Sequence, residues 1–111
     1  MAFYDVTPKQ LGQAAITTSY ATIYTTPADV RTFVKDMDIV NTTAASIDVY
    51  VSFVPSGGTA GTSNAIFYAS PLPAYTTLQW CGSQILNAAE TIQVKASASG
   101  CTITVSGGEA I

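Results

Sequence analysis

The sequence contains no histidine, and charged residues make up only 10% of it. Histidine is the usual base beside a serine or cysteine nucleophile, so its absence excludes Ser-His-Asp and Cys-His sites within one chain. Seven acidic residues outnumber four basic ones, which gives a formal net charge of −3 and leaves no basic cluster. Nucleic acid is therefore not expected as a partner. We expect a protein that is not an enzyme and binds no cofactor.

Long apolar runs are also missing. The stretch Ile47–Val54 is interrupted by Asp48 and Ser52, and it is far shorter than the roughly 20 residues of a membrane-spanning helix. The first residues, MAFYDVTPKQ, have neither the charged start nor the apolar centre of a secretory signal. Apolar residues still make up 48% of the chain, which excludes intrinsic disorder. We expect one folded domain that does not interact with a membrane.

Cysteine is scarce. Cys81 and Cys101 belong to no CxxC pair, and without histidine they are not expected to bind zinc. Two interpretations stay open: a disulfide between neighbouring strands, or two buried free thiols. The second is favoured. No metal site is expected.

What the chain does have is a period of two. In Ser46–Val54, apolar residues at every second position alternate with polar ones, which is typical of a half-buried strand. Thr91–Ala98 and Thr102–Ser106 repeat the pattern, and Thr, Val, Ile and Tyr dominate all three stretches. A helical period of 3.6 residues appears nowhere. The sequence therefore predicts strands and almost no helix.

Turn-forming residues separate these runs at regular intervals. They predict about eight short strands, at Ala21–Thr26, Val30–Val40, Ser46–Val54, Ala65–Ser70, Tyr75–Trp80, Gln84–Leu86, Thr91–Ala98 and Thr102–Ser106. Short strands at such spacing predict an all-β fold, a β-sandwich or jelly roll of antiparallel strands with an extended N-terminal segment.

Residues 1–15 stand apart from the β-sandwich domain expected at 16–111. They lack clear alternation, and no local turn implies a strand partner. One interpretation is a first strand with a frayed start. The other is an arm that contacts a neighbouring subunit through its apolar side chains. The expected contact residues are Phe3, Tyr4, Val6 and Leu11.

Two further groups of residues invite a chemical interpretation. Asp36 and Asp38 lie on one face of a predicted strand, as a glycosidase pair or half a calcium site would. A solvent-exposed strand beside Lys35 is the favoured explanation. Tyr68, Tyr75 and Trp80 are candidates for an aromatic platform that binds a sugar ring, although such residues more often belong to a core or an interface.

From about Tyr20 onwards the sequence resembles small structural proteins of tailed bacteriophages, of the decoration or cement type. Strand and turn signatures carry the resemblance, and no catalytic motif accompanies them. They lie at Ala21–Ala28, Val30–Asn41, Ile47–Val51, Val54–Gly58, Tyr68, Pro71–Pro73, Leu86–Ser97 and Val105–Glu109.

The resemblance implies a virion protein, assembled in the cytoplasm of the bacterial host. It would coat or stabilise the head, commonly as a homotrimer in contact with the major capsid protein. A neck, collar, tail or fibre component is one alternative, and a carbohydrate-binding module for host attachment is another. The composition also suggests self-association, because a domain of this size buries only about two-thirds of its unfolded surface. We expect the remaining apolar area to form subunit contacts.

Overall fold

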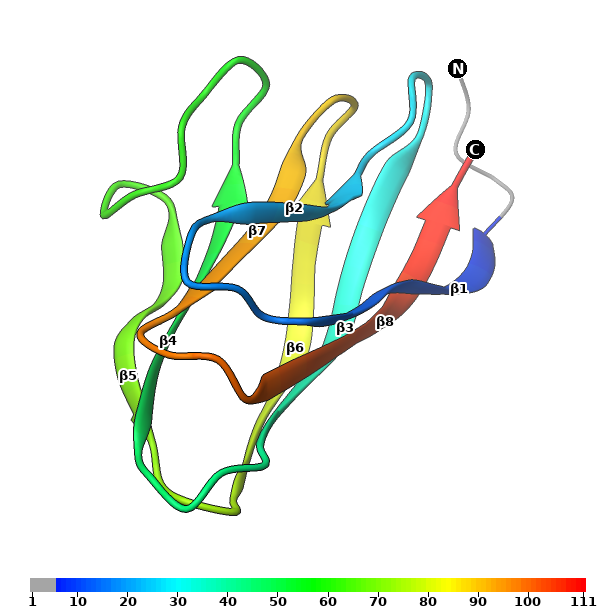
Figure 1. The fold of residues 1–111 in the computed structure, drawn as a ribbon. Coiled ribbons are helices and arrows are strands. Elements are labelled where there is room, and N and C mark those ends of the chain that lie inside the picture. Colours follow the sequence, from blue (N-terminus) through cyan, green and yellow to red (C-terminus); the bar gives the residue numbers. More distant parts are fainter. Residues whose placement is uncertain (1–5) are drawn as a thin grey trace.

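Eight strands form two four-stranded sheets in the computed structural model, which describes residues 6–111. The first sheet has the order β1 (Val6–Ala15), β8 (Cys101–Ala110), β3 (Arg31–Asn41), β6 (Thr77–Leu86). The second has the order β2 (Ala21–Thr25), β7 (Thr91–Ala96), β4 (Ile47–Val54), β5 (Ala65–Leu72). All neighbouring strands are antiparallel. The predicted all-β sandwich of eight antiparallel strands is confirmed (Figure 1).

The pairing is nested along the chain. β4 pairs with β5, β3 with β6, β2 with β7, and β1 with β8. The chain is thus one long antiparallel ribbon folded over on itself, and its successive pairs fall alternately into the two sheets. This is the connectivity of a jelly roll, in which two sheets pack face to face.

The core lies between the sheets and follows from the period of two. Ile47, Val49 and Val51 of β4 point inward and are at most 2% exposed. β7 and β8 contribute in the same way, and β3 presents two buried residues before a register shift and three after it. The buried side chains of β7, β8 and β3 are Ile92, Val94, Ala96, Cys101, Ile103, Val105, Ala110, Thr32, Val34, Met37, Ile39 and Asn41.

Two predicted strand positions differ from the structure. The stretches predicted at Tyr75–Trp80 and Gln84–Leu86 belong to one strand, β6, which begins at Thr77. Two residues of β6, at 82 and 83, stand opposite the single residue Lys35 of β3, so a β-bulge produces the break in pattern that suggests two strands.

The N-terminal segment contributes a strand to the first sheet. Val6–Ala15 forms β1, which pairs with β8 of the same chain along its whole length. A register shift between Gln10 and Gly12 turns Leu11 into the core, where it is 5% exposed. The strand shows no alternation because of this shift and of Pro8.

The total exposed area is that of an ordinary compact monomer. The molecule exposes 5645 Å², close to the roughly 5,800 Å² expected of a compact monomer of this mass. Five large hydrophobic side chains are exposed among the described residues: Val6, Tyr68, Tyr75, Ile85 and Ile111. The sandwich covers its core because almost every inward position of the eight strands is apolar.

Candidate functional site

The residues expected to form an N-terminal contact arm lie in different environments. Phe3 and Tyr4 fall outside the described residues. Val6 begins β1 opposite Ala110 and is 55% exposed, whereas Leu11 is buried in the chain's own core. The prediction of Leu11 as an interface residue was wrong, because the bulge in β1 points it inward.

The three aromatic residues proposed as a sugar-binding platform do not share a surface. Tyr68 lies on β5, where its ring contacts Tyr50, and Tyr75 lies in the exposed turn between β5 and β6. Trp80 is partly buried between the sheets, with its ring 6.5 Å from that of Phe53 on β4 and perpendicular to it. The platform of Tyr68, Tyr75 and Trp80 is therefore not present.

A different aromatic group crosses the outer face of the second sheet. Tyr50 lies at the centre, with its ring centroid 5.1 Å from that of Tyr68 and 6.4 Å from that of Tyr20. The ammonium nitrogen of Lys95 lies 4.4 Å from the centre of the Tyr50 ring and 5.0 Å from that of Tyr20. These four residues come from β4, β5, β7 and the segment before β2, so only the strand register brings them together.

The tyrosine rings meet edge to face, at interplanar angles of 76° and 88°. Edge-to-face contacts stabilise an aromatic cluster, and the cation between two rings adds to this. The rings do not form one flat surface, so the cluster does not provide the coplanar platform expected for a sugar chain.

Asp36 and Asp38 lie on the outer face of the first sheet, on either side of the buried Met37. The Sγ atom of Cys81 on β6 lies 3.8 Å from Oδ1 of Asp36. Desolvation and the neighbouring Asp36 carboxylate raise the pKa of the Cys81 thiol. Within residues 6–111, no three His, Cys, Asp or Glu side chains come together in a way that would hold a metal ion.

The two cysteines are free thiols, Cys81 exposed and Cys101 buried. They lie on β6 and β8, which flank β3 on opposite sides, opposite Asp36 and Asn41 respectively. Five residues along β3 and two strand spacings across it separate the α-carbons by roughly 19 Å. A disulfide needs about 4.4–6.8 Å. An intramolecular bridge is therefore excluded, and of the two thiols expected to be buried only Cys101 is.

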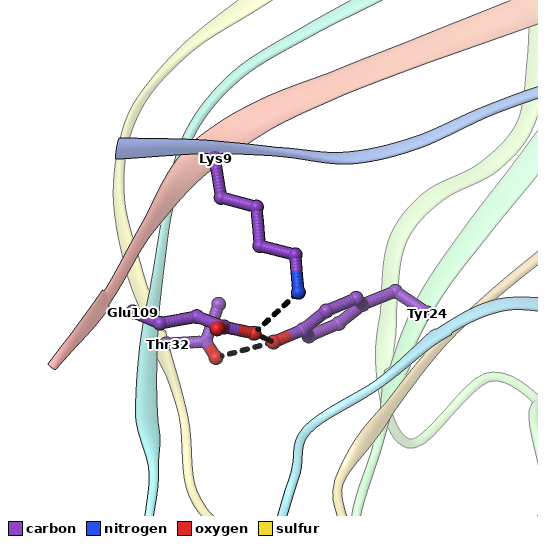
Figure 2. Close-up of polar contacts among 4 residues, drawn as sticks. All are labelled: Lys9, Tyr24, Thr32 and Glu109. Atoms are coloured by element: carbon purple, nitrogen blue, oxygen red, sulfur yellow. Dashed lines mark hydrogen bonds and ion pairs between the residues drawn. The ribbon is translucent and has the colours of Figure 1, made fainter. Parts of the chain in front are cut away.

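A polar cluster that the sequence did not reveal joins the two sheets (Figure 2). The hydroxyl of Tyr24 on β2 donates a hydrogen bond of 2.5 Å to Oε2 of Glu109 on β8. That hydroxyl lies 2.8 Å from the Thr32 hydroxyl on β3, which donates to it because the Tyr24 proton is already used. Lys9 on β1 lies 3.2 Å from the same Glu109 oxygen.

Burial and hydrogen bonding shift the pKa values of Tyr24 and Glu109 in this cluster. Tyr24 is 8% exposed, and desolvation together with its hydrogen bond to Glu109 raises its pKa to about 12. The bond from Tyr24, supported by Lys9, lowers the pKa of Glu109 against its own desolvation. The cluster thus holds an ionised carboxylate and a neutral phenol at neutral pH. It acts as a clamp between the sheets and presents no free group to a ligand.

No pocket is found on the part of the chain that the structure describes. That part also contains no helix with the length and hydropathy of a membrane span.

The comparisons with known proteins identify fold relatives only. The sequence matches no family model and no curated protein. Among solved structures, the chain is similar to one from infectious bursal disease virus, Gx strain, with a TM-score of 0.57 and 11% identity. The match covers 96% of this chain and 32% of the viral one, so this chain spans about a third of that protein. The VP2 subviral particle of the same virus gives a TM-score of 0.51 at 9% identity, with 96% and 32% covered.

A second kind of structure is also similar. It comes from Bacillus endospore appendages, described as a family of disulfide-linked pili. The TM-score is 0.52 at 15% identity, and the match covers 99% of this chain and 93% of that one. At identities this low, the structural matches show a shared fold alone, and unrelated proteins can share a fold.

Proposed function

We propose that this chain is a non-enzymatic structural protein of a virion, which associates with copies of itself and with other proteins of the particle. The fold carries the proposal, because a complete jelly roll with no pocket among its described residues suits packing against neighbours. The likeness to chains of a virus particle supports it. Titratable groups are few, and two of those with shifted pKa values, Tyr24 and Glu109, hold the two sheets together.

In its finer form the proposal is a decoration or cement protein of a tailed-bacteriophage head. It would act as a homotrimer in contact with the major capsid protein and would be assembled in the cytoplasm of the bacterial host. The resemblance of the sequence to such proteins from Tyr20 onwards supports this form. A position in the neck, collar, tail or fibre is the alternative within the same class.

Binding to assembled heads tests the proposal. The purified protein is mixed with heads built from the major capsid protein of its phage, and the heads are sedimented. Co-sedimentation at a fixed ratio of copies per capsid protein, with density at defined sites in a reconstruction, is expected. A protein that stays in the supernatant with heads, necks and tails alike would overturn it.

A second candidate is the subunit of an extracellular filament. One observation favours it: the match to the pilus chain covers nearly all of both chains, whereas the viral matches cover about a third of theirs. Filaments seen by electron microscopy in the purified protein, without any capsid component, would support this candidate over the first.

The carbohydrate-binding alternative loses its structural basis. Trp80 lies between the sheets, and the exposed tyrosine rings are perpendicular to one another. Unchanged Trp80 fluorescence across a panel of glycans is the expected result.

A further inference from the structure

The four edge strands of the sandwich, two in each sheet, differ in how well their free edges are protected. An unpaired edge invites another strand, and proteins block it with charge, proline, bulges or short length. β1 carries Pro8 and Lys9, and β2 has only five residues with a register shift. β5 contains Pro71 and two register shifts. β6, at the end of the first sheet beside β3 (Figure 1), has ten residues with neither charge nor proline.

β6 is regular over half of its length. From Thr77 to Cys81 it pairs without interruption with Val40–Asp36, and the bulge opposite Lys35 begins only after Cys81. Its alternate residues Thr77, Gln79 and Cys81 are exposed, on the outer face. This five-residue segment therefore offers a straight, uncharged and unprotected edge.

The hydrophobic core is least covered on the same side of the sandwich. Six hydrophobic residues that pack on the core are only partly buried, and all but Ile23 belong to β4, β5 and β6. On β6 they are Leu78 and Trp80, the inward residues of the regular segment. Large apolar side chains with Trp among them are typical of the centre of a protein interface.

We propose that β6 is the contact surface for a second copy of this chain, and that the two β6 strands pair antiparallel about a two-fold axis at Gln79. The segment is self-complementary in this arrangement. Leu78 lies opposite Trp80 of the second copy, and Trp80 opposite its Leu78. An aromatic residue facing an aliphatic one is a stabilising cross-strand pair.

The absence of charge selects a copy of the same strand as the occupant. A two-fold axis brings identical residues together, so any charged residue near the axis would face its like. Thr77 lies opposite Cys81 of the second copy, and the two Gln79 amides meet at the axis. The carboxylate nearest the axis, Asp38, lies opposite Gln79 on the next strand, β3, so its counterpart in the other copy lies about three strand spacings away, roughly 14 Å.

This contact deepens the self-association in the proposed function and rests on it. Because it is two-fold, it produces pairs of subunits. If a trimer forms through other surfaces, the β6 contact joins two trimers. In either case the oligomer of the purified protein contains an even number of chains.

Charge placed at the axis tests the proposal. Gln79→Glu adds two facing negative charges at an exposed position beside the carboxylate of Asp38, and Gln13→Glu on β1 is the matched control at the opposite edge. We expect the wild type to have an even multiple of 11.5 kDa by light scattering. In Gln79→Glu the contact should weaken at least tenfold, while Gln13→Glu behaves as wild type. Emission of the single tryptophan, Trp80, should shift to longer wavelength only in Gln79→Glu.

Cross-linking tests the register. Gln79→Cys in a Cys81→Ser background should form a disulfide-linked dimer on mild oxidation of the isolated protein, and Gln13→Cys in that background should not. A mass of one or three chains at every concentration, or equal cross-linking of both variants, would overturn the proposal. A β6 dimer that binds no virion component would refute the proposed function and leave this contact standing.

Discussion

Tyr24 and Glu109, 85 positions apart, form the shortest polar link between the two sheets among the described hydrogen bonds, 2.5 Å from hydroxyl to carboxylate. Replacement of Tyr24 by Phe keeps the ring and removes this bond and the acceptor for Thr32. A buried hydrogen bond to a charged group contributes about 1.5–3 kcal/mol. We expect the free energy of unfolding to fall by about that amount in denaturant titrations. Tyr75→Phe, at a residue 71% exposed, should change it by less than about 0.5 kcal/mol.

The same pair predicts how stability depends on pH. The pKa of Glu109 is lowered by folding, so its contribution is present above the unfolded pKa and is lost as pH falls through the folded one. The pKa of Tyr24 is raised from 10.0 to about 12, so its contribution is present below pH 10 and is lost between these two values. Glu109→Gln should flatten the acid side of the stability profile, and Tyr24→Phe the alkaline side. Thermal melts from pH 3 to 12 measure both. If neither variant changes the pH dependence of stability, the contributions assigned to Glu109 and Tyr24 are wrong.

Position 107 on β8 requires glycine, because the backbone of β3 lies very close to it. A Cβ atom there would collide with the carbonyl oxygen of Phe33 on the neighbouring β3. Gly107→Ala should therefore lower the free energy of unfolding by roughly 3 kcal/mol or more, because backbone must move. Gly61→Ala is the control, since no atom lies within 4 Å of the position its added methyl group would take, and the effect should be near zero. Equal stability of the two variants would contradict the strand register.

Asn41 is fully buried at the end of β3, where its amide connects two loops. Its nitrogen donates to the carbonyls of Ala45, Leu72 and Pro73, and its oxygen accepts from Thr43. Asn41→Leu keeps the branched shape and the number of side-chain heavy atoms and leaves these groups unpaired, at an expected loss of about 2–4 kcal/mol in unfolding free energy. Asn87→Ala, at an exposed turn, should have little effect. Hydrogen exchange of the Thr43 amide should rise in the first variant only.

The two thiols should differ in reactivity. In the native protein a thiol reagent should modify Cys81 alone, and Cys101 should react only on unfolding. Desolvation and the Asp36 carboxylate keep the Cys81 pKa above its usual value, and Asp36→Asn removes the second cause, so it should speed the reaction at pH 7. Asp38→Asn, which contributes less to that shift, should speed it less. Reaction at both cysteines at equal rates in the folded state would contradict the structure.

The sequence predicted the strands whose alternation is uninterrupted, and it missed features that depend on pairing between distant segments. β4, β7 and β8 show a clear period of two, and their positions agree with the prediction within a few residues. For β1 the sequence left two interpretations open, a first strand or an arm, because its bulge at Leu11 and its Pro8 break the period. Its partner β8 lies about a hundred residues later, and the Lys9–Glu109 pair spans that distance.

The candidate sites depended on strand register even more strongly. Nothing local to Tyr50 and Lys95 indicates that they face each other across β4 and β7. The clamp draws Lys9, Tyr24 and Glu109 from three strands in two sheets, at no characteristic spacing. Conversely, Tyr68 and Trp80 are close in sequence but lie on different sheets. Composition gives the low charge of the chain, but which side chains meet on its surfaces follows only from the strand register.

The position of β8 has a consequence for biosynthesis. This strand lies between β1 and β3, so during synthesis β1 has no partner in its sheet until β8 has emerged from the ribosome. The first sheet therefore forms only after β8 is made, and contacts so distant in sequence make its folding slow. Removal of β8 would separate β1 from β3 as well, which makes a shortened chain a ready substrate for cellular proteases.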